Sequence, residues 1–146
     1  MVWAFLLLAI AAGCALPVQA GINAQLAEWV GGPIRASMIA FGVGFTLLLV
    51  VALLATRGVV NADKVGGAPW WAWLGGAGGA FYVASAVAAA PRLGALNLFA
   101  AVVLGQLACS VLLDHYGVLY SQHELTAGRV VGIVLLATGV ALVRFF

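Results

Sequence analysis

The sequence predicts an all-α membrane protein with five transmembrane helices, and two observations carry that prediction. The chain has 146 residues, of which 66% are hydrophobic and only 7% charged, and its mean hydropathy is +1.20; no soluble globular domain has such a composition. Its apolar runs are also long enough to cross a bilayer, which takes about 20 apolar residues per helix. We expect residues 1–146 to form a single transmembrane domain.

Polar breaks divide the chain into the expected helices. The first apolar run ends at Glu28, Trp29 and a glycine pair, and Pro33, a residue favoured in a first helical turn, opens the second run. Residues 70–113 would extend roughly 66 Å as one helix, about twice the bilayer core, so this run must fold back. Pro91-Arg92 is the expected corner. The helices are therefore expected at residues 2–27, 33–56, 70–90, 92–113 and 127–146.

The N-terminal apolar run is expected to be a transmembrane helix and not a cleaved signal peptide. No Lys or Arg precedes Arg35, whereas a signal peptide begins with a basic region.

No group of residues in the sequence forms a catalytic or metal site. His115 and His123 lie in one loop without matching ligands, and Cys14 and Cys109 are expected to be small buried hydrophobic residues inside apolar runs. There is no nucleophile–His–acid set and no phosphate-binding loop, so we expect no enzyme, cofactor or metal. The ten charges are scattered and form no basic patch, which excludes nucleic acid as a partner.

The positive charges give the chain almost no preferred orientation. Five crossings would place the termini on opposite faces, with Arg57, Lys64 and Arg129 on the N-terminal face (side one) and Arg35, Arg92 and Arg144 on the other (side two). Membrane proteins are oriented by an excess of Lys and Arg on one side. The balance predicts dual topology, with copies inserted both ways; the alternative is that hydrophobicity or insertion order selects one orientation.

A polar stretch interrupts the first apolar run. Pro17 lacks an N–H, which frees the Gly13 carbonyl and kinks the helix, and Gln19 and Asn23 are four residues apart on one face. In lipid, freed backbone groups are tolerated only where protein or a wet cavity covers them. The stretch predicts a polar cavity near mid-membrane; the alternative is a bent, packed helix whose amides bond to neighbouring helices.

Further polar residues follow in the third and fourth predicted helices. Tyr82 and Ser85 share one face, while Gln106 and Asp114 lie on one stripe of the next helix. From the rise per residue, Gln19 and Gln106 fall at different depths in one protomer but at the same depth in an antiparallel pair. We therefore expect an antiparallel homodimer with a shared chamber, in which substrate contacts Gln19, Asn23, Tyr82, Ser85 and Gln106.

No carboxylate lies deep in any predicted span. Buried ionisable groups usually mark the sites that couple transport to the movement of an ion or proton. Their absence favours neutral or zwitterionic substrates, or such coupling through Asp114. The alternative for Asp114 is a residue that caps its helix. Gly128, Gly132 and Gly139 lie along one face of the last helix, which suits a subunit interface because small residues let helices approach closely.

These motifs together resemble a known family. The segments are P-V-Q-A-G-I-N-A-Q-L, G-G-P-I-R-A-S-M, P-W-W-A-W-L-G-G, P-R-L-G-A, and G-Q-L followed by D-H-Y-G. They are similar to the YdcZ-type half-size members of the drug/metabolite transporter superfamily, and the last helix resembles that of small multidrug resistance proteins. The resemblance implies half of an inverted-repeat transporter fold, working as an antiparallel dimer in the bacterial inner membrane, with Gly132 and Gly139 at the dimer contact. No Glu lies in the middle of the first helix, where Cys14 and Ala15 stand, which argues against proton-coupled export of bulky cations.

The leading functional hypothesis is a multi-pass secondary transporter of a small polar metabolite that works by alternating access. A passive channel for small solutes or ions fits the same apolar walls and dual topology. A membrane subunit that binds a partner without transporting anything is the third hypothesis.

Overall fold

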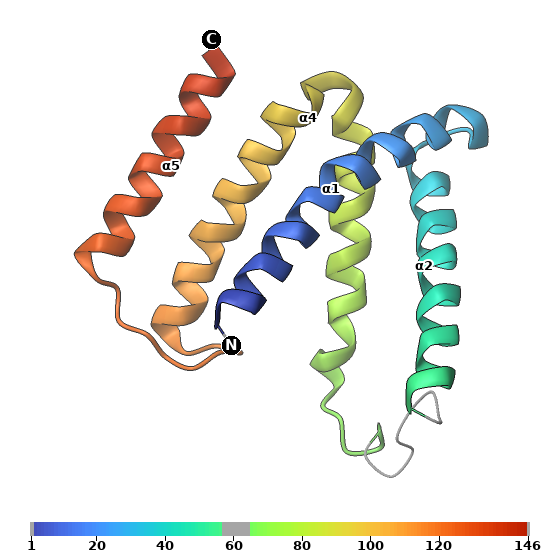
Figure 1. The fold of residues 1–146 in the computed structure, drawn as a ribbon, viewed down its shortest axis with the longest axis horizontal. Coiled ribbons are helices and arrows are strands. Elements are labelled where there is room, and N and C mark those ends of the chain that lie inside the picture. Colours follow the sequence, from blue (N-terminus) through green and yellow to red (C-terminus); the bar gives the residue numbers. More distant parts are fainter. Residues whose placement is uncertain (1, 57–64, 146) are drawn as a thin grey trace. The chain divides into compact units, whose positions relative to one another are not determined.

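A computed structural model describes residues 2–56 and 65–145, and the elements in these ranges are helices joined by turns and loops (Figure 1). They are α1 (Val2–Val30), α2 (Pro33–Thr56), the 3₁₀ helix η1 (Trp70–Leu74), α4 (Gly75–Tyr116) and α5 (Ala127–Phe145). Within the described ranges, four helical stretches are long and apolar enough to cross a membrane: Val2–Val30, Pro33–Ala55, Trp70–Tyr116 and Ala127–Phe145. The all-α class is confirmed. Arg57 and Lys64, two of the charges counted on side one, lie outside the described residues.

The chain forms two compact units, Met1–Arg92 and Leu93–Phe146. The N-terminal unit holds α1, α2, η1 and the part of α4 up to Arg92. The C-terminal unit holds the remainder of α4 and α5. The assignment of residues 1–146 to one domain stays a prediction.

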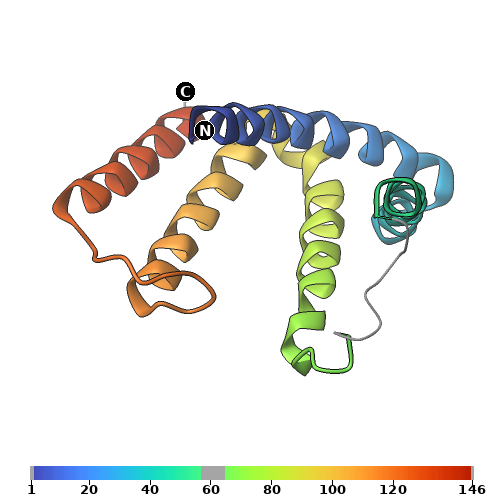
Figure 2. The same cartoon turned by 60° about the horizontal axis from the view of Figure 1, so that its bottom comes forward.

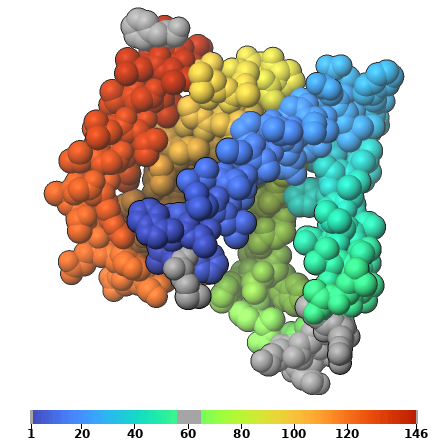
Figure 3. Space-filling model, in the orientation of Figure 1, coloured from blue at the N-terminus to red at the C-terminus, as the bar shows by residue number. Residues whose placement is uncertain are grey.

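The turn between α1 and α2 is built on two glycines. The Ala27 carbonyl accepts hydrogen bonds from the N–H groups of Gly31 and Gly32 at 3.1 and 2.8 Å, and these glycines have φ angles of 81° and 136°. Glycine adopts positive φ without a steric penalty, which is why it commonly ends helices. The N–H of Ala36 then bonds the Gly32 carbonyl at 3.1 Å and opens α2. In Figure 3 the light-blue end of α1 lies against the cyan start of α2.

Small residues let the helices of the N-terminal unit approach closely. Ala20, Ala36, Ala86 and Val87 are buried, and Figures 1 and 2 show the second half of α1 crossing the first part of α4. Residues 2–15, by contrast, are all exposed. Lipid is as apolar as leucine, so apolar side chains have no need to be covered by protein. The same reason explains why the predicted burial of Cys14 and Cys109 is wrong, since both are exposed.

The backbone of α4 is interrupted at Gly94, which has φ 72° and ψ 162°. This combination is essentially restricted to glycine. The corner predicted at Pro91-Arg92 is therefore displaced, because Pro91 stays within helical backbone while Gly94 leaves it. On the far side of the interruption, Asn97 Nδ2 donates a hydrogen bond to the Leu93 carbonyl at 3.1 Å.

A short aromatic segment precedes α4. Pro69 has an extended backbone and leads into η1, whose Trp70, Trp71 and Trp73 are all exposed. Tryptophan is enriched at membrane–water interfaces, where its ring is apolar and its N–H stays hydrated. The segment therefore fits the beginning of a membrane span.

Candidate solute-binding site

The N-terminal unit contains a cavity of about 350 Å³ that is open on one side, since Phe45 and Leu48 in its lining are 67% and 69% exposed. Every lining residue except one is apolar or glycine, and the exception is Gln19. Apolar walls with a few placed polar groups are typical of small-molecule sites. The lining consists of Gln19 from α1, Ala40, Phe41, Gly44, Phe45 and Leu48 from α2, and Val83 from α4.

A much smaller void lies where α1 crosses the first part of α4. Its volume is about 10 Å³, close to the room that one water molecule needs. One face of α1, with Leu16, Gln19, Ala20 and Asn23, lines one side, and Tyr82, Val83, Ala86 and Val87 of α4 line the other. Gln19 and Val83 border both the cavity and the void. The two spaces therefore lie on either side of Gln19 and Val83.

Asn23 brings an unpartnered polar atom to this void. The residue is only 5% exposed, and its Nδ2 is buried without a hydrogen-bond partner. A buried, unsatisfied donor costs about 1–3 kcal/mol, and native proteins leave few such groups unfilled. The Nδ2 group is therefore available to a water molecule or to a polar atom of a ligand.

The structure brings together three of the five residues predicted to bind substrate. Gln19, Asn23 and Tyr82 meet around the small void. Ser85, one turn beyond Tyr82, is exposed and borders neither of the two spaces. Gln106 belongs to the C-terminal unit, where it is exposed on α4.

The predicted kink lies at the boundary between the exposed and the packed parts of α1. Gly13 is exposed and Pro17 is partly buried. Helix α1 is assigned as helical from Val2 to Val30 with Pro17 inside it. A kink at this proline stays a prediction.

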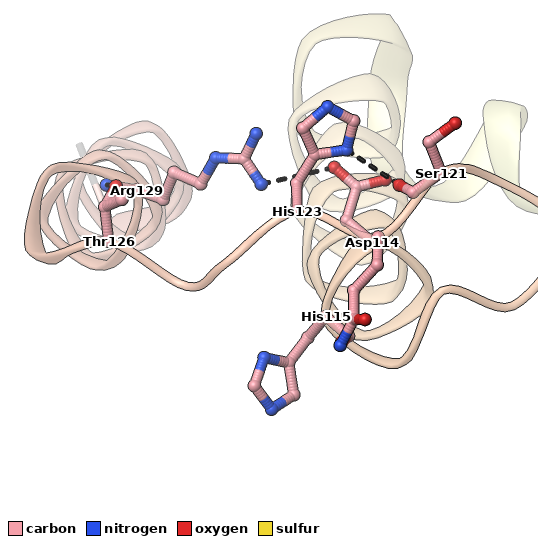
Figure 4. Close-up of polar contacts among 7 residues, drawn as sticks. Asp114, His115, Ser121, His123, Thr126 and Arg129 are labelled. Carbon is pink, nitrogen blue, oxygen red and sulfur yellow. Dashed lines mark hydrogen bonds and ion pairs between the residues drawn. The ribbon is translucent and has the colours of Figure 1, made fainter.

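Asp114 joins α4 to the start of α5 (Figure 4). Its Oδ2 lies 3.3 Å from Nη1 of Arg129, and the two side chains are 31% and 38% exposed. The Asp114 carbonyl also accepts hydrogen bonds from the N–H groups of Gly117 at 3.3 Å and His123 at 2.9 Å. These contacts fold the polar loop back onto the end of α4. A role for Asp114 in coupling stays a prediction.

The glycine face of α5 is open in the described chain. A Cβ atom added at Gly128, Gly132 or Gly139 would meet no atom within 4 Å of it. The predicted use of this face in a dimer is therefore compatible with the space around the helix.

Sequence reasoning missed the α2 wall of the cavity. Ala40, Phe41, Phe45 and Leu48 continue an apolar pattern that looks the same whether it faces lipid, a helix or a cavity. The available signal was Gly44, which with Gly42 thins one stretch of α2.

Comparison with known proteins identifies the family of this chain. Residues 4–142 match the family described as "Putative inner membrane exporter, YdcZ". No curated protein and no solved structure gives a significant match. The match covers nearly the whole chain and agrees with the four long apolar helices found among the described residues. The chain therefore belongs to the YdcZ family of inner membrane proteins and is a multi-pass membrane transporter.

Proposed function

We propose that this protein is a secondary transporter that exports a small solute across the bacterial inner membrane through the cavity at Gln19. The observation that carries the proposal is the position of Gln19, which borders both the cavity and the void between three apolar helices. Irregular or polar groups among spanning helices occur where protein or a wet cavity covers them. Transporters commonly hold their solute in such a site, around which the helices rearrange.

The proposal includes five membrane crossings. Helix α4 has 42 residues, which correspond to roughly 63 Å at 1.5 Å per residue, about twice a bilayer core. The interruption at Gly94 divides it into two stretches, each close to the length of one span. A five-helix chain of this kind would be one half of an inverted-repeat transporter.

We further propose that two copies form an antiparallel homodimer. The three-to-three balance of Lys and Arg between the two faces supports insertion in both orientations. The open glycine face of α5 supports close contact with a second copy. In such a dimer Gln106 of one copy would reach the depth of Gln19 of the other, and alternating access would come from rocking of the copies.

Counterflow in proteoliposomes tests the transport proposal. Purified protein is reconstituted with a panel of labelled neutral, zwitterionic and charged solutes, and accelerated uptake against an internal unlabelled pool identifies a carrier. Gln19→Ala should lower the counterflow rate about tenfold, since an amide that contacts the solute is worth about 1.4 kcal/mol. Gln25→Ala is the matched control, because Gln25 is exposed on the same helix, as Gln19 is, but lines neither space.

Two results would contradict the proposal. Uptake without acceleration by an internal pool would indicate a passive channel. Equal counterflow in the wild type and Gln19→Ala would remove Gln19 from the transport path.

A further inference from the structure

Building on the proposed transport function, we infer that the solute is an uncharged molecule with an apolar body and a hydrogen-bond acceptor, and that Asn23 donates the hydrogen bond that recognises the acceptor. The apolar body occupies the cavity of about 350 Å³. The acceptor enters the small void of about 10 Å³.

The lining of the cavity argues for an apolar, uncharged body. The large lining side chains are Phe41, Phe45 and Leu48, and no lining residue is ionisable. A charged group taken from water into such a site would find no counter-charge to offset its desolvation. The volume lies near the lower end of the range for small-molecule sites, which runs from about 300 to 1,000 Å³. The cavity therefore suits a compact, neutral solute.

The small void argues for a single acceptor atom on that solute. Asn23 is nine-tenths buried or more, and its Nδ2 is a donor with no partner. The void has room for about one oxygen-sized group. In this inference a solute in the cavity extends one carbonyl or ether oxygen past Gln19, which lines both spaces, toward Asn23. Binding would then satisfy a donor that the empty site leaves unpaired.

Four probes with a shared phenylbutyl skeleton separate the contributions of body, acceptor and charge. The probes are 4-phenylbutan-2-one, n-butylbenzene, 4-phenylbutanoate and 4-phenylbutylammonium. Binding to the full chain in lipid nanodiscs is measured by equilibrium dialysis, with empty nanodiscs subtracted. The neutral ketone should bind about tenfold more tightly than the hydrocarbon, as one well-placed hydrogen bond provides, and more tightly than either ion.

Three substitutions, one of them a control, assign the binding to this site. Asn23→Leu keeps a similar volume and removes the amide, so the ketone should bind no better than n-butylbenzene, whose affinity should change less than about twofold. Gly44→Leu should abolish binding of both, because Gly44 lines the cavity and a Cβ added there meets no atom within 4 Å. Gly42→Leu has the same open surroundings without lining the cavity, and it should retain binding.

Three results would overturn the inference. They are equal binding of ketone and hydrocarbon, as in a groove that holds lipid chains, tighter binding of either ion, or no binding of any probe. The order of probe affinities for the wild type requires no substitution, so it tests the inference even if Asn23→Leu does not fold. Counterflow with Gln19→Ala decides the transport proposal separately, which keeps the two failures distinguishable.

Discussion

At Gly94 the backbone of α4 takes a conformation that only glycine adopts without strain. Gly94→Ala should therefore lower the free energy of unfolding by about 1–3 kcal/mol. Gly105 lies in helical backbone of the same element, and a Cβ added there meets no atom within 4 Å. Gly105→Ala should instead raise the free energy of unfolding by about 0.5–1 kcal/mol.

Reversible unfolding in mixed micelles measures both substitutions at Gly94 and Gly105. Because both add one methyl group to the same helix, an opposite sign isolates the backbone conformation from the added bulk. Destabilisation of similar size at both positions would show that the interruption at Gly94 is not held by its positive φ.

Residues that line the candidate site stand out in the sequence when they are polar and do not when they are apolar. Gln19, Asn23 and Tyr82 stand out because an apolar run has no other use for them than packing or a cavity. Phe41 and Phe45 do not stand out, because lipid and an apolar cavity both favour apolar side chains. Only the packing of α1 and α4 against α2 distinguishes the two surroundings.

At the scale of the elements, the ion pair between Asp114 and Arg129 links the end of α4 to the start of α5. Both side chains are about one-third exposed, so water screens their attraction. A double-mutant cycle with Asp114→Asn and Arg129→Gln should give a coupling energy of about 0.2–1 kcal/mol. Raising the salt concentration should reduce that coupling further.

The measured quantity is the free energy of unfolding of the wild type, the two single variants and the double variant. A coupling energy of about 3 kcal/mol or more, unaffected by salt, would indicate a buried pair. That outcome would make Asp114 a stronger candidate for coupling transport to an ion or proton than its partial exposure now indicates.

The ends of the elements were predicted to within a few residues where the cue was local. Helix α2 has the predicted bounds, because Pro33 and the preceding glycines act within one turn. Helix α1 continues three residues past its predicted end, since Glu28 and Trp29 are polar or interfacial without being helix breakers. In α4 the corner was predicted at Pro91, whereas the structure interrupts the helix at Gly94. Proline can remain within a helix, but the backbone conformation of Gly94 cannot.

At the scale of the whole molecule, apolar composition predicted a membrane protein directly, because each helix crosses a bilayer of fixed thickness. The division into the units Met1–Arg92 and Leu93–Phe146 was not predicted. A continuous apolar run from residue 70 to residue 113 carries no composition change at the boundary. Contacts among helices, which hydropathy does not encode, define the units.

The balanced charges of the molecule lead to a prediction about its orientation in the membrane. Ser121→Lys adds a positive charge to the loop on side one, and Arg144→Gln removes one from side two. Each change creates an excess of Lys and Arg on side one, which should draw that side to the cytoplasm. With five crossings the C-terminus lies on side two, so both variants should place it in the periplasm. Ser121→Gln adds no charge and should behave as the wild type.

Fusions to the C-terminus report this orientation in cells. Green fluorescent protein is fluorescent when it stays in the cytoplasm, and alkaline phosphatase is active only in the periplasm. The wild type should show both signals, whereas Ser121→Lys and Arg144→Gln should each gain phosphatase activity and lose fluorescence. A wild type with one signal only, unmoved by either charge change, would mean that all copies insert the same way. An antiparallel homodimer could not then form, and the shared chamber between Gln19 and Gln106 would have to be abandoned.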